Sequence, residues 1–167
     1  QPALGTVHLF GEEVTERKRV EERLLHDALH DALTGLPNRH LFQDRVAQTM
    51  ALSRRSGRAM AVLFIDLDRF KLVNDAQGRE AGDRLLQAAA LRLSQTVRGG
   101  DTVGRFGGDE FGVVLANLGK PGDASLVAQK IIDALAHPVE LDGHETYVTA
   151  SIGISIYPAD AAEPETL

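Results

Sequence analysis

Residues 59–68 read AMAVLFIDLD, an apolar run that ends in acidic residues. An apolar run of this length is typical of a strand that is buried on both faces of a sheet. Asp66 and Asp68 are two residues apart at the end of the run, and this spacing places both side chains on one face of the strand. Because a buried carboxylate without a partner is costly, acid at the end of such a strand indicates a site that stabilises negative charge.

The segments that follow alternate between helical and extended patterns. We expect helices from Asn38, which can cap the first of them, to about Arg55, and over residues 81–97 and 123–136. Residues 101–106 and 110–115 predict a hairpin, and residues 138–141 and 147–158 predict further strands. Strands separated by helices but including a hairpin predict an α/β fold of the α+β type, in which helices flank one mixed sheet.

The N-terminal residues are organised differently. Residues 5–10, GTVHLF, alternate apolar and polar side chains and predict one short strand, which is too little to fold alone. Residues 12–33 have a helical pattern, with apolar residues at three- and four-residue steps toward the end. The first half of this helix is nearly all charged, which is typical of a connector or of one half of a helix pair.

The composition excludes several classes of protein. The net charge of -6 gives no support to nucleic-acid binding through a basic surface. The absence of cysteine excludes disulfides, thiolate zinc sites and a thiol nucleophile. No apolar run approaches the roughly 18 residues that cross a bilayer, and residues 1–11 lack the pattern of a signal peptide. We therefore expect a cytoplasmic fragment, whose parent protein could carry a membrane anchor elsewhere.

A second pair of carboxylates lies in the predicted hairpin, where residues 105–111 read RFGGDEF. If this turn lies beside the end of the buried strand, Asp66, Asp109 and Glu110 converge. Carboxylates about 4 Å apart repel by roughly 4 kcal/mol per pair at an effective dielectric constant of about 20. A bound cation or protonation relieves this repulsion, and oxygen ligands without Cys or His favour Mg²⁺ or Mn²⁺. A solvated turn next to a strand-end acid explains the same residues equally well.

Five motifs in order resemble a single family. They are DALTGLPNR at 31–39, FIDLDRFKLVND at 64–75, GREAGD at 78–83, RFGGDEF at 105–111 and ASIGISIYP at 150–158. Together they resemble the GGDEF domain of diguanylate cyclases, which are enzymes of bacterial signal transduction. The resemblance implies a nucleotidyl-cyclase or palm-like fold with a largely antiparallel sheet flanked by helices. It also implies a nucleotidyltransferase that condenses two GTP molecules into cyclic di-GMP.

The resemblance implies a metal site at the matching carboxylates. Asp66, Asp109 and the Leu67 carbonyl would bind Mg²⁺ or Mn²⁺, and Glu110 would support metal binding and catalysis. Two such ions would polarise the α-phosphate and acidify the attacking 3′-hydroxyl. Each domain carries one GTP and each 3′-hydroxyl attacks the other molecule, so the resemblance implies a head-to-tail homodimer. A single domain would bind GTP without turnover.

The resemblance also implies residues that bind the nucleotide. Gly107 and Gly108 would run along the triphosphate, and Lys71 would reach a phosphate oxygen. Asn74 and Asp83 would read guanine, because a carboxylate accepts hydrogen bonds from N1 and N2 and an amide completes the base edge. In other contexts residues 70–75 are typical of a helical turn, and Asp83 of the first turn of a helix, where acids are favoured.

Arg98 and Asp101, in the sequence RGGD, match the RxxD inhibitory site at which the family binds its product, cyclic di-GMP. The resemblance thus implies feedback inhibition. A helix end followed by a glycine turn explains the same residues.

The resemblance divides the chain into three parts. Residues 1–11 would be the last strand of a PAS sensor domain, residues 12–33 a connector or coiled-coil helix, and residues 34–167 a GGDEF domain cut off before its closing helix and strand. Gly78-Arg79 stands where the family usually has Gly-His, near the guanine site. The alternative to a cyclase is a catalytically weak module that senses GTP or cyclic di-GMP and controls an attached phosphodiesterase domain. A third possibility is a dimerisation connector in which the cyclase fold is only structural.

Overall fold

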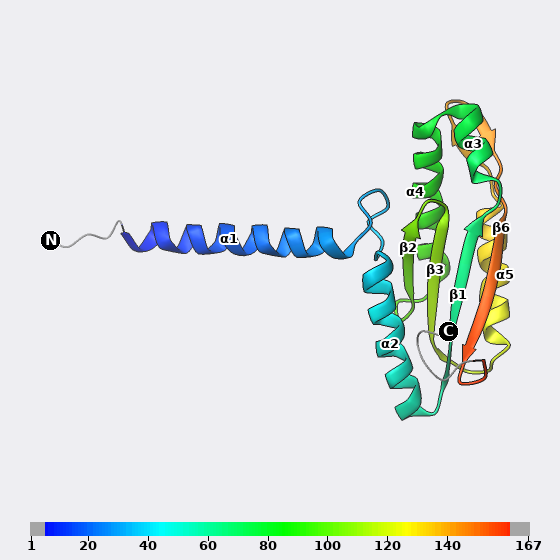
Figure 1. Cartoon of the computed structure of the whole chain (residues 1–167), viewed down its shortest axis with the longest axis horizontal. Coiled ribbons are helices and arrows are strands. Elements are labelled where there is room, and N and C mark those ends of the chain that lie inside the picture. Colours follow the sequence, from blue (N-terminus) through cyan, green and yellow to red (C-terminus); the bar gives the residue numbers. More distant parts are fainter. Residues whose placement is uncertain (1–5, 161–167) are drawn as a thin grey trace.

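The structure is a computed structural model and describes residues 6–160 (Figure 1). A four-stranded sheet with the order β2-β3-β1-β6 forms its centre. The strands are β1 (Ala59–Leu67), β2 (Thr102–Gly107), β3 (Glu110–Leu118) and β6 (Ala150–Tyr157). Neighbouring strands of this sheet are antiparallel. The predicted α+β class, with a largely antiparallel sheet flanked by helices, is confirmed.

Helices cover both faces of the sheet. Helix α2 (Arg39–Ser56) packs on one face, while α4 (Arg79–Thr96) and α5 (Asp123–Leu135) pack on the other. The side chains of β1 alternate between these two layers: Met60 and Val62 lie in the cluster with α2, and Leu63 and Ile65 in the cluster with α4 and α5. The prediction of a strand buried on both faces is therefore confirmed for most of β1. Asp66, near its end, is exposed.

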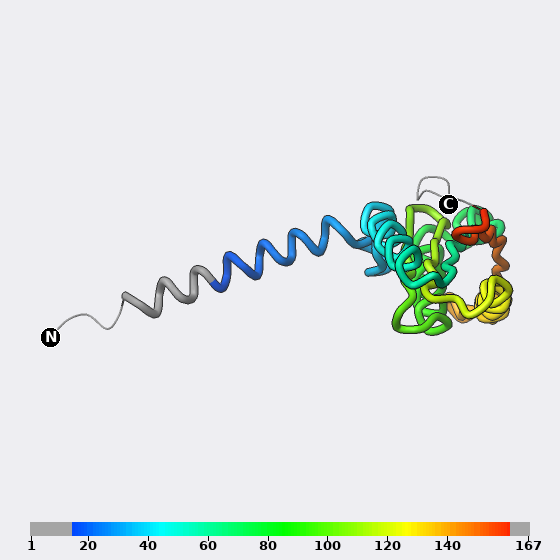
Figure 2. Tube along the Cα trace, turned by 90° about the horizontal axis from the view of Figure 1, so that it is seen from below, coloured from blue at the N-terminus to red at the C-terminus, as the bar shows by residue number. Residues whose placement is uncertain are grey.

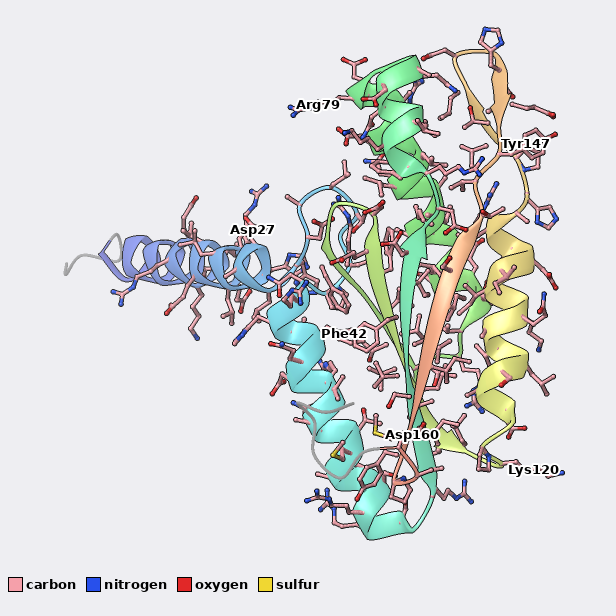
Figure 3. All side chains as sticks on the ribbon, turned by 45° about the vertical axis from the view of Figure 1, so that its right-hand side comes forward. Asp27, Phe42, Arg79, Lys120, Tyr147 and Asp160 are labelled. Atoms are coloured by element: carbon pink, nitrogen blue, oxygen red, sulfur yellow. The ribbon has the colours of Figure 1, made fainter. Side chains whose placement is uncertain are left out.

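Helix α2 lies close to the hairpin because two glycines face its largest side chain. Gly104 and Gly112 are directly opposite each other on β2 and β3, and a methyl group on either would collide with the Phe42 ring. Phe42, which Figure 3 labels on α2, makes an edge-to-face contact with Phe106 at 4.9 Å between ring centroids. The predicted cap of α2 is also confirmed, since the Asn38 side chain accepts a hydrogen bond from the Leu41 N–H at 3.1 Å.

Helix α1 (Thr6–Leu29) leads away from the rest of the structure (Figure 2). It ends four residues before the expected boundary at Leu33. The Thr34 N–H and hydroxyl donate to the Asp31 carboxylate at 2.9 and 2.7 Å, and the Asn38 N–H donates to the Leu29 carbonyl at 2.9 Å. Such local bonds from polar side chains compete with a continuing helix.

The short strand expected over residues 5–10 is not formed, because the described part of that segment belongs to α1. A helix satisfies its backbone N–H and C=O groups internally, whereas a strand needs a partner, and no strand among residues 6–160 pairs with this segment. This prediction was wrong for the secondary structure, and the assignment of residues 1–11 to a PAS domain stays a prediction. No helix in the described part of the chain is long and apolar enough to cross a membrane.

Two small elements differ from expectation at the other end of the chain. Strands β4 (Val139–Leu141) and β5 (His144–Thr146) form a separate hairpin, and β6 begins at Ala150, not at residue 147. Asp142 and Gly143 form the turn with φ angles of 51° and 80°. An Asp-Gly pair with two positive φ angles is a favoured two-residue hairpin turn. A short helix, α3 (Phe70–Gln77), follows β1 and packs against α4.

Candidate functional site

Asp66 and Glu110 lie directly opposite each other on β1 and β3. Side chains at opposite positions of antiparallel strands share one face, about 4.5–5.5 Å apart at Cβ, and like charges there repel. Partial loss of hydration raises the pKa of the Asp66 carboxyl, and the charges of Asp109, Glu110 and Asp68 raise it further. The structure thus brings together the carboxylates that the sequence places on two separate strands.

Asp109 lies at the tip of the hairpin between β2 and β3. Gly107 and Gly108 precede it with φ angles of 122° and 52°, which strain any residue with a side chain. The Leu67 N–H donates to the Asp109 carbonyl at 3.2 Å, so the hairpin tip is joined to the end of β1. The peptide between Asp66 and Leu67 is therefore bonded to the residue at the hairpin tip.

The donor chemistry of this cluster fits a hard divalent cation. The carboxylates of Asp66 and Asp109 and the carbonyl of Leu67 are all oxygen donors, as Mg²⁺ prefers. The mutual repulsion that raises the pKa of Asp66 is the kind that a bound cation relieves. Among the side chains that the structure describes, those of residues 15–160, no set of three His, Asp or Glu is gathered closely enough to hold a metal ion by itself. A cation at this position would also need oxygens from the backbone or from a substrate.

Glu110 has a cationic neighbour that the sequence analysis missed. The Arg39 guanidinium, at the first position of α2, lies 3.5 Å from the Glu110 carboxylate and 5.0 Å from the Phe106 ring centroid. Both partners of this ion pair are more than half exposed, so it contributes little to stability. Arg39, Asp66, Phe106 and Glu110 line a cavity of about 540 Å³ on the α2 face of the sheet. An arginine at the first position of a helix gives no sequence signal of this contact.

Arg105 is the second residue that the sequence analysis missed. Its Nε and Nη2 donate to the Gly108 carbonyl at 3.1 and 2.8 Å, and its Nη1 donates to both carboxylate oxygens of Asp31 at 2.9 and 3.0 Å. Burial alone would raise the pKa of Asp31, but hydrogen bonds from Thr34 and Arg105 outweigh burial and hold this pKa below its usual value. Arg105 thus fixes the hairpin tip against the loop after α1. A buried charge in an otherwise apolar strand is the signal that could have identified it.

The two residues predicted to read guanine lie on neighbouring helices. Asn74 is half-buried on α3, and Asp83 is exposed near the start of α4. A methyl group on Gly82 would collide with Oδ1 of Asn74, so the Asn74 side chain lies against the residue that precedes Asp83. Gly82 is buried and also escaped the sequence analysis. Lys71 is exposed in the first turn of α3.

Arg98 and Asp101 lie at the opposite end of β2 from the hairpin tip. Asp101 is almost fully buried and accepts hydrogen bonds from the backbone N–H groups of Arg98 and Ala116, at 3.1 and 3.0 Å. The Arg98 side chain is 68% exposed, and together with His30 and Arg45 it lines a cavity of about 570 Å³. Six residues of strand at about 3.3 Å each separate this region from Asp109 by about 20 Å. Asp101 therefore builds the turn. The Arg98 guanidinium lies 3.5 Å from the Asp101 carboxylate and donates to the Ala116 carbonyl at 3.3 Å, and it remains largely exposed.

The motifs and this geometry agree with known proteins. The family model described as "Diguanylate cyclase, GGDEF domain" matches residues 28–167. The bifunctional diguanylate cyclase/cyclic di-GMP phosphodiesterase MucR of Pseudomonas aeruginosa is 46% identical over 146 residues, which cover 87% of this chain and 21% of MucR. The diguanylate cyclase TpbB of the same organism is 43% identical over 145 residues, which cover 86% of this chain and 33% of TpbB.

The fold also matches a solved structure. A truncated form of Pseudomonas aeruginosa TpbB that comprises only the GGDEF domain superposes with a TM-score of 0.81 at 42% sequence identity. The match covers 83% of this chain and 81% of that structure. The chain therefore corresponds to one domain of its relatives, since it spans about a fifth of MucR and a third of TpbB.

Proposed function

The chain belongs to the GGDEF family of diguanylate cyclase domains, and we propose on this premise that it condenses two GTP molecules into cyclic di-GMP and pyrophosphate. The observation that carries the proposal is the position of Asp66 opposite Glu110, with Asp109 at the adjoining hairpin tip. Three carboxylates at the same end of the sheet repel one another, which is costly for folding. A bound cation that carries a triphosphate would relieve this repulsion.

The chain's own residues would hold the metal and the phosphates. Asp66, Asp109 and the Leu67 carbonyl hold Mg²⁺ or Mn²⁺, which when bound polarises the α-phosphate and acidifies the attacking 3′-hydroxyl. Glu110, whose charge Arg39 partly balances, supports this site from the neighbouring position on β3. Each of these roles is a proposal that rests on the motif and on the position of the residue.

The nucleotide would extend from the hairpin tip toward α3 and α4. Gly107 and Gly108 have no side chain at the tip, so a triphosphate can approach their backbone closely. Lys71, exposed on α3, would neutralise a phosphate oxygen. The Asp83 carboxylate accepts from the N1 and N2 hydrogens of guanine and the Asn74 amide completes the base edge. Gly82 leaves the space that the Asn74 side chain occupies.

Turnover would require a second copy of the chain. Each 3′-hydroxyl attacks the α-phosphate held by the other domain, so two domains must face each other head to tail. Helix α1 supports such pairing because Val20 and Leu24, four residues apart, expose 52% and 65% of their surface. Leu25 adds a third exposed apolar side chain. Cyclic di-GMP would bind at the Arg98 cavity and inhibit the dimer.

The proposal is tested by incubating the chain with GTP and Mg²⁺ and measuring cyclic di-GMP by chromatography and mass spectrometry. We expect product whose rate of formation rises faster than linearly with protein concentration, because the active species is a dimer. The Asp109→Asn variant should form no product. Failure of the wild-type chain to bind GTP in the presence of Mg²⁺ would refute the proposal.

A second candidate is a regulatory module that binds GTP or cyclic di-GMP and controls an attached phosphodiesterase domain. The observation that favours it is the similarity to MucR, whose name combines cyclase and phosphodiesterase activities. Tight GTP binding without turnover, at concentrations where sedimentation shows dimers, would favour this candidate over the cyclase. The presence of a PAS or a phosphodiesterase domain in the parent protein stays a prediction.

A further inference from the structure

The turn between β1 and α3 is fastened to the start of β6 through Asp68. The Thr149 hydroxyl donates to Oδ2 of Asp68 and the Ser151 hydroxyl donates to Oδ1, both at 2.7 Å. The Asp68 N–H donates to the Thr149 carbonyl at 2.8 Å. Both carboxylate oxygens are therefore held by protein hydroxyls. This arrangement suits a structural anchor better than a metal ligand.

The residue after Asp68 shows that this turn is held under strain. Arg69 has a φ angle of 57°, in the left-handed region that residues with a side chain rarely adopt. Such a conformation persists only where the surrounding structure fixes it. The bonds from Thr149 and Ser151 fix Asp68, which precedes Arg69 in the turn. Helix α3 begins directly after Arg69 and fixes the other end of the turn.

Helix α3 is fastened to the same part of the chain at its other end. Gln77, its last residue, exchanges hydrogen bonds with the Thr146 hydroxyl at 3.1 and 3.3 Å. The segment from Thr146 to Ser151 thus holds α3 at both ends. Tyr147, which belongs to this segment, lies beside the α3 end of the molecule in Figure 3.

We propose that Asp68, held by Thr149 and Ser151, is a positioning residue for the metal and nucleotide site. It sets the orientation of the Leu67 carbonyl on one side and of the helix that carries Lys71 and Asn74 on the other. This inference rests on the proposed function, because it assigns Asp68 a role toward Mg²⁺ and GTP. It goes beyond that function because it gives the two carboxylates different roles. Asp68 binds protein hydroxyls, whereas Asp66 binds the metal.

Three variants separate an anchor from a metal ligand. In Asp68→Asn, the amide can accept from one hydroxyl and donate to the other, so the anchor is kept while the charge is lost. In Asp68→Ala, both bonds are lost. In the double variant Thr149→Val with Ser151→Ala, the carboxylate remains but its partners are removed.

We expect Asp68→Ala and the double variant to weaken Mg²⁺-GTP binding by about 10- to 100-fold, as removal of residues that orient ligands does. Asp68→Asn should lose much less affinity than Asp68→Ala, because it keeps both bonds and loses only the charge.

Calorimetry with Mg²⁺-GTP and hydrogen exchange of the α3 amides in the metal-free protein supply two separate readouts. Faster exchange at Leu72 and Asn74 in the double variant, with wild-type exchange in Asp68→Asn, supports the anchor. Equal losses of affinity in Asp68→Asn and Asp68→Ala would overturn it, because the charge would then be what matters. So would an unchanged affinity and exchange rate in the double variant, which keeps the anchor testable if Asp68→Ala fails to fold. If the wild-type chain binds no Mg²⁺-GTP, the proposed function fails, and the exchange rates alone decide on the anchor.

Discussion

Arg105 and Asp31 form a partly buried ion pair between two segments that are 74 residues apart in the chain. The same guanidinium holds the Gly108 carbonyl, so one side chain joins the loop after α1 to the tip of the glycine hairpin. The position of Asp109 therefore depends on a residue near the end of α1.

Removal of Arg105 should destabilise the protein strongly. The side chains of Arg105 and Asp31 are only 10% and 20% exposed, and Arg105→Ala leaves the Asp31 carboxylate without its cationic partner, with only the bonds from Thr34 remaining. Breaking such a pair costs about 3–5 kcal/mol of unfolding free energy. The matched control is Arg84→Ala, which breaks the exposed pair with Asp142 and should cost no more than about 1 kcal/mol. Urea unfolding measures both, and similar losses in the two variants would contradict the structural role of Arg105.

Acid should weaken the same contact. The pKa of Asp31 is lower in the folded than in the unfolded protein, so its contribution to stability is complete above about pH 4, the usual value for Asp. This contribution is lost as the pH falls through the lowered pKa of the folded state. Urea unfolding at a series of acid pH values should show a smaller pH dependence in Asp31→Asn than in the wild type. Identical pH dependence in the two proteins would show that Asp31 does not titrate as described.

Replacement of Asp66 by Asn should have opposite effects on stability and on binding. The raised pKa of Asp66 means that its ionised form is unfavourable in the folded state, so stability from this group falls as the pH rises through that pKa. Asp66→Asn should therefore stabilise the metal-free protein at neutral pH and weaken Mg²⁺-dependent GTP binding. Thermal unfolding and calorimetry check the two effects, with Asp75→Asn, on the exposed surface of α3, as the control. A variant that binds Mg²⁺-GTP as tightly as the wild type would remove Asp66 from the metal site.

Gly82→Ala should weaken the choice of GTP over ATP. The added methyl group meets the Asn74 amide, which must rotate away from the position proposed for the guanine edge. A buried polar group that loses its partner costs about 1–3 kcal/mol, so GTP affinity should fall by roughly 5- to 150-fold while weak ATP binding changes little. Gly122→Ala, where the added methyl group meets no atom within 4 Å, is the matched control. Unchanged discrimination in Gly82→Ala would show that Asn74 does not read the base.

Arg98→Ala should lose cyclic di-GMP binding and keep GTP binding. The Arg98 guanidinium is exposed at a cavity far from Asp109, and a planar guanidinium pairs well with phosphate or guanine acceptors. A charge-assisted contact contributes roughly 1.5–3 kcal/mol, which corresponds to a loss of about 10- to 150-fold in affinity. Calorimetry with each nucleotide measures the separation. If the variant binds cyclic di-GMP as tightly as the wild type, Arg98 and Asp101 only end a helix and form a turn.

Most of the fold could be predicted because its signals are local. The apolar run of β1 and the Asn38 cap each depend on a few neighbouring residues, and the structure confirms both. The motifs led us to expect Asp66 and Glu110 close together, and the pairing of β1 with β3 places them directly opposite each other. The ion pairs of Arg105 with Asp31 and of Arg39 with Glu110 could not be predicted in the same way, since each joins residues more than 70 positions apart. The Asp142-Gly143 turn had a local signal that the sequence analysis did not use.

The number of residues in α1 determines the rotational direction of its N-terminal end as well as the distance of that end from the sheet. Each residue of an α-helix adds about 1.5 Å and turns the chain by about 100°. Because the last turn of α1 is bonded to Asn38, and Asp31 to Arg105, its end cannot rotate freely relative to the hairpin. Deleting two residues within α1 would therefore turn its N-terminal end by about 200° relative to the carboxylates, whereas deleting seven would leave it within about 20° of its present direction. The number of residues in this helix thus sets the rotational direction of its N-terminal end relative to the metal site proposed for Asp66 and Asp109.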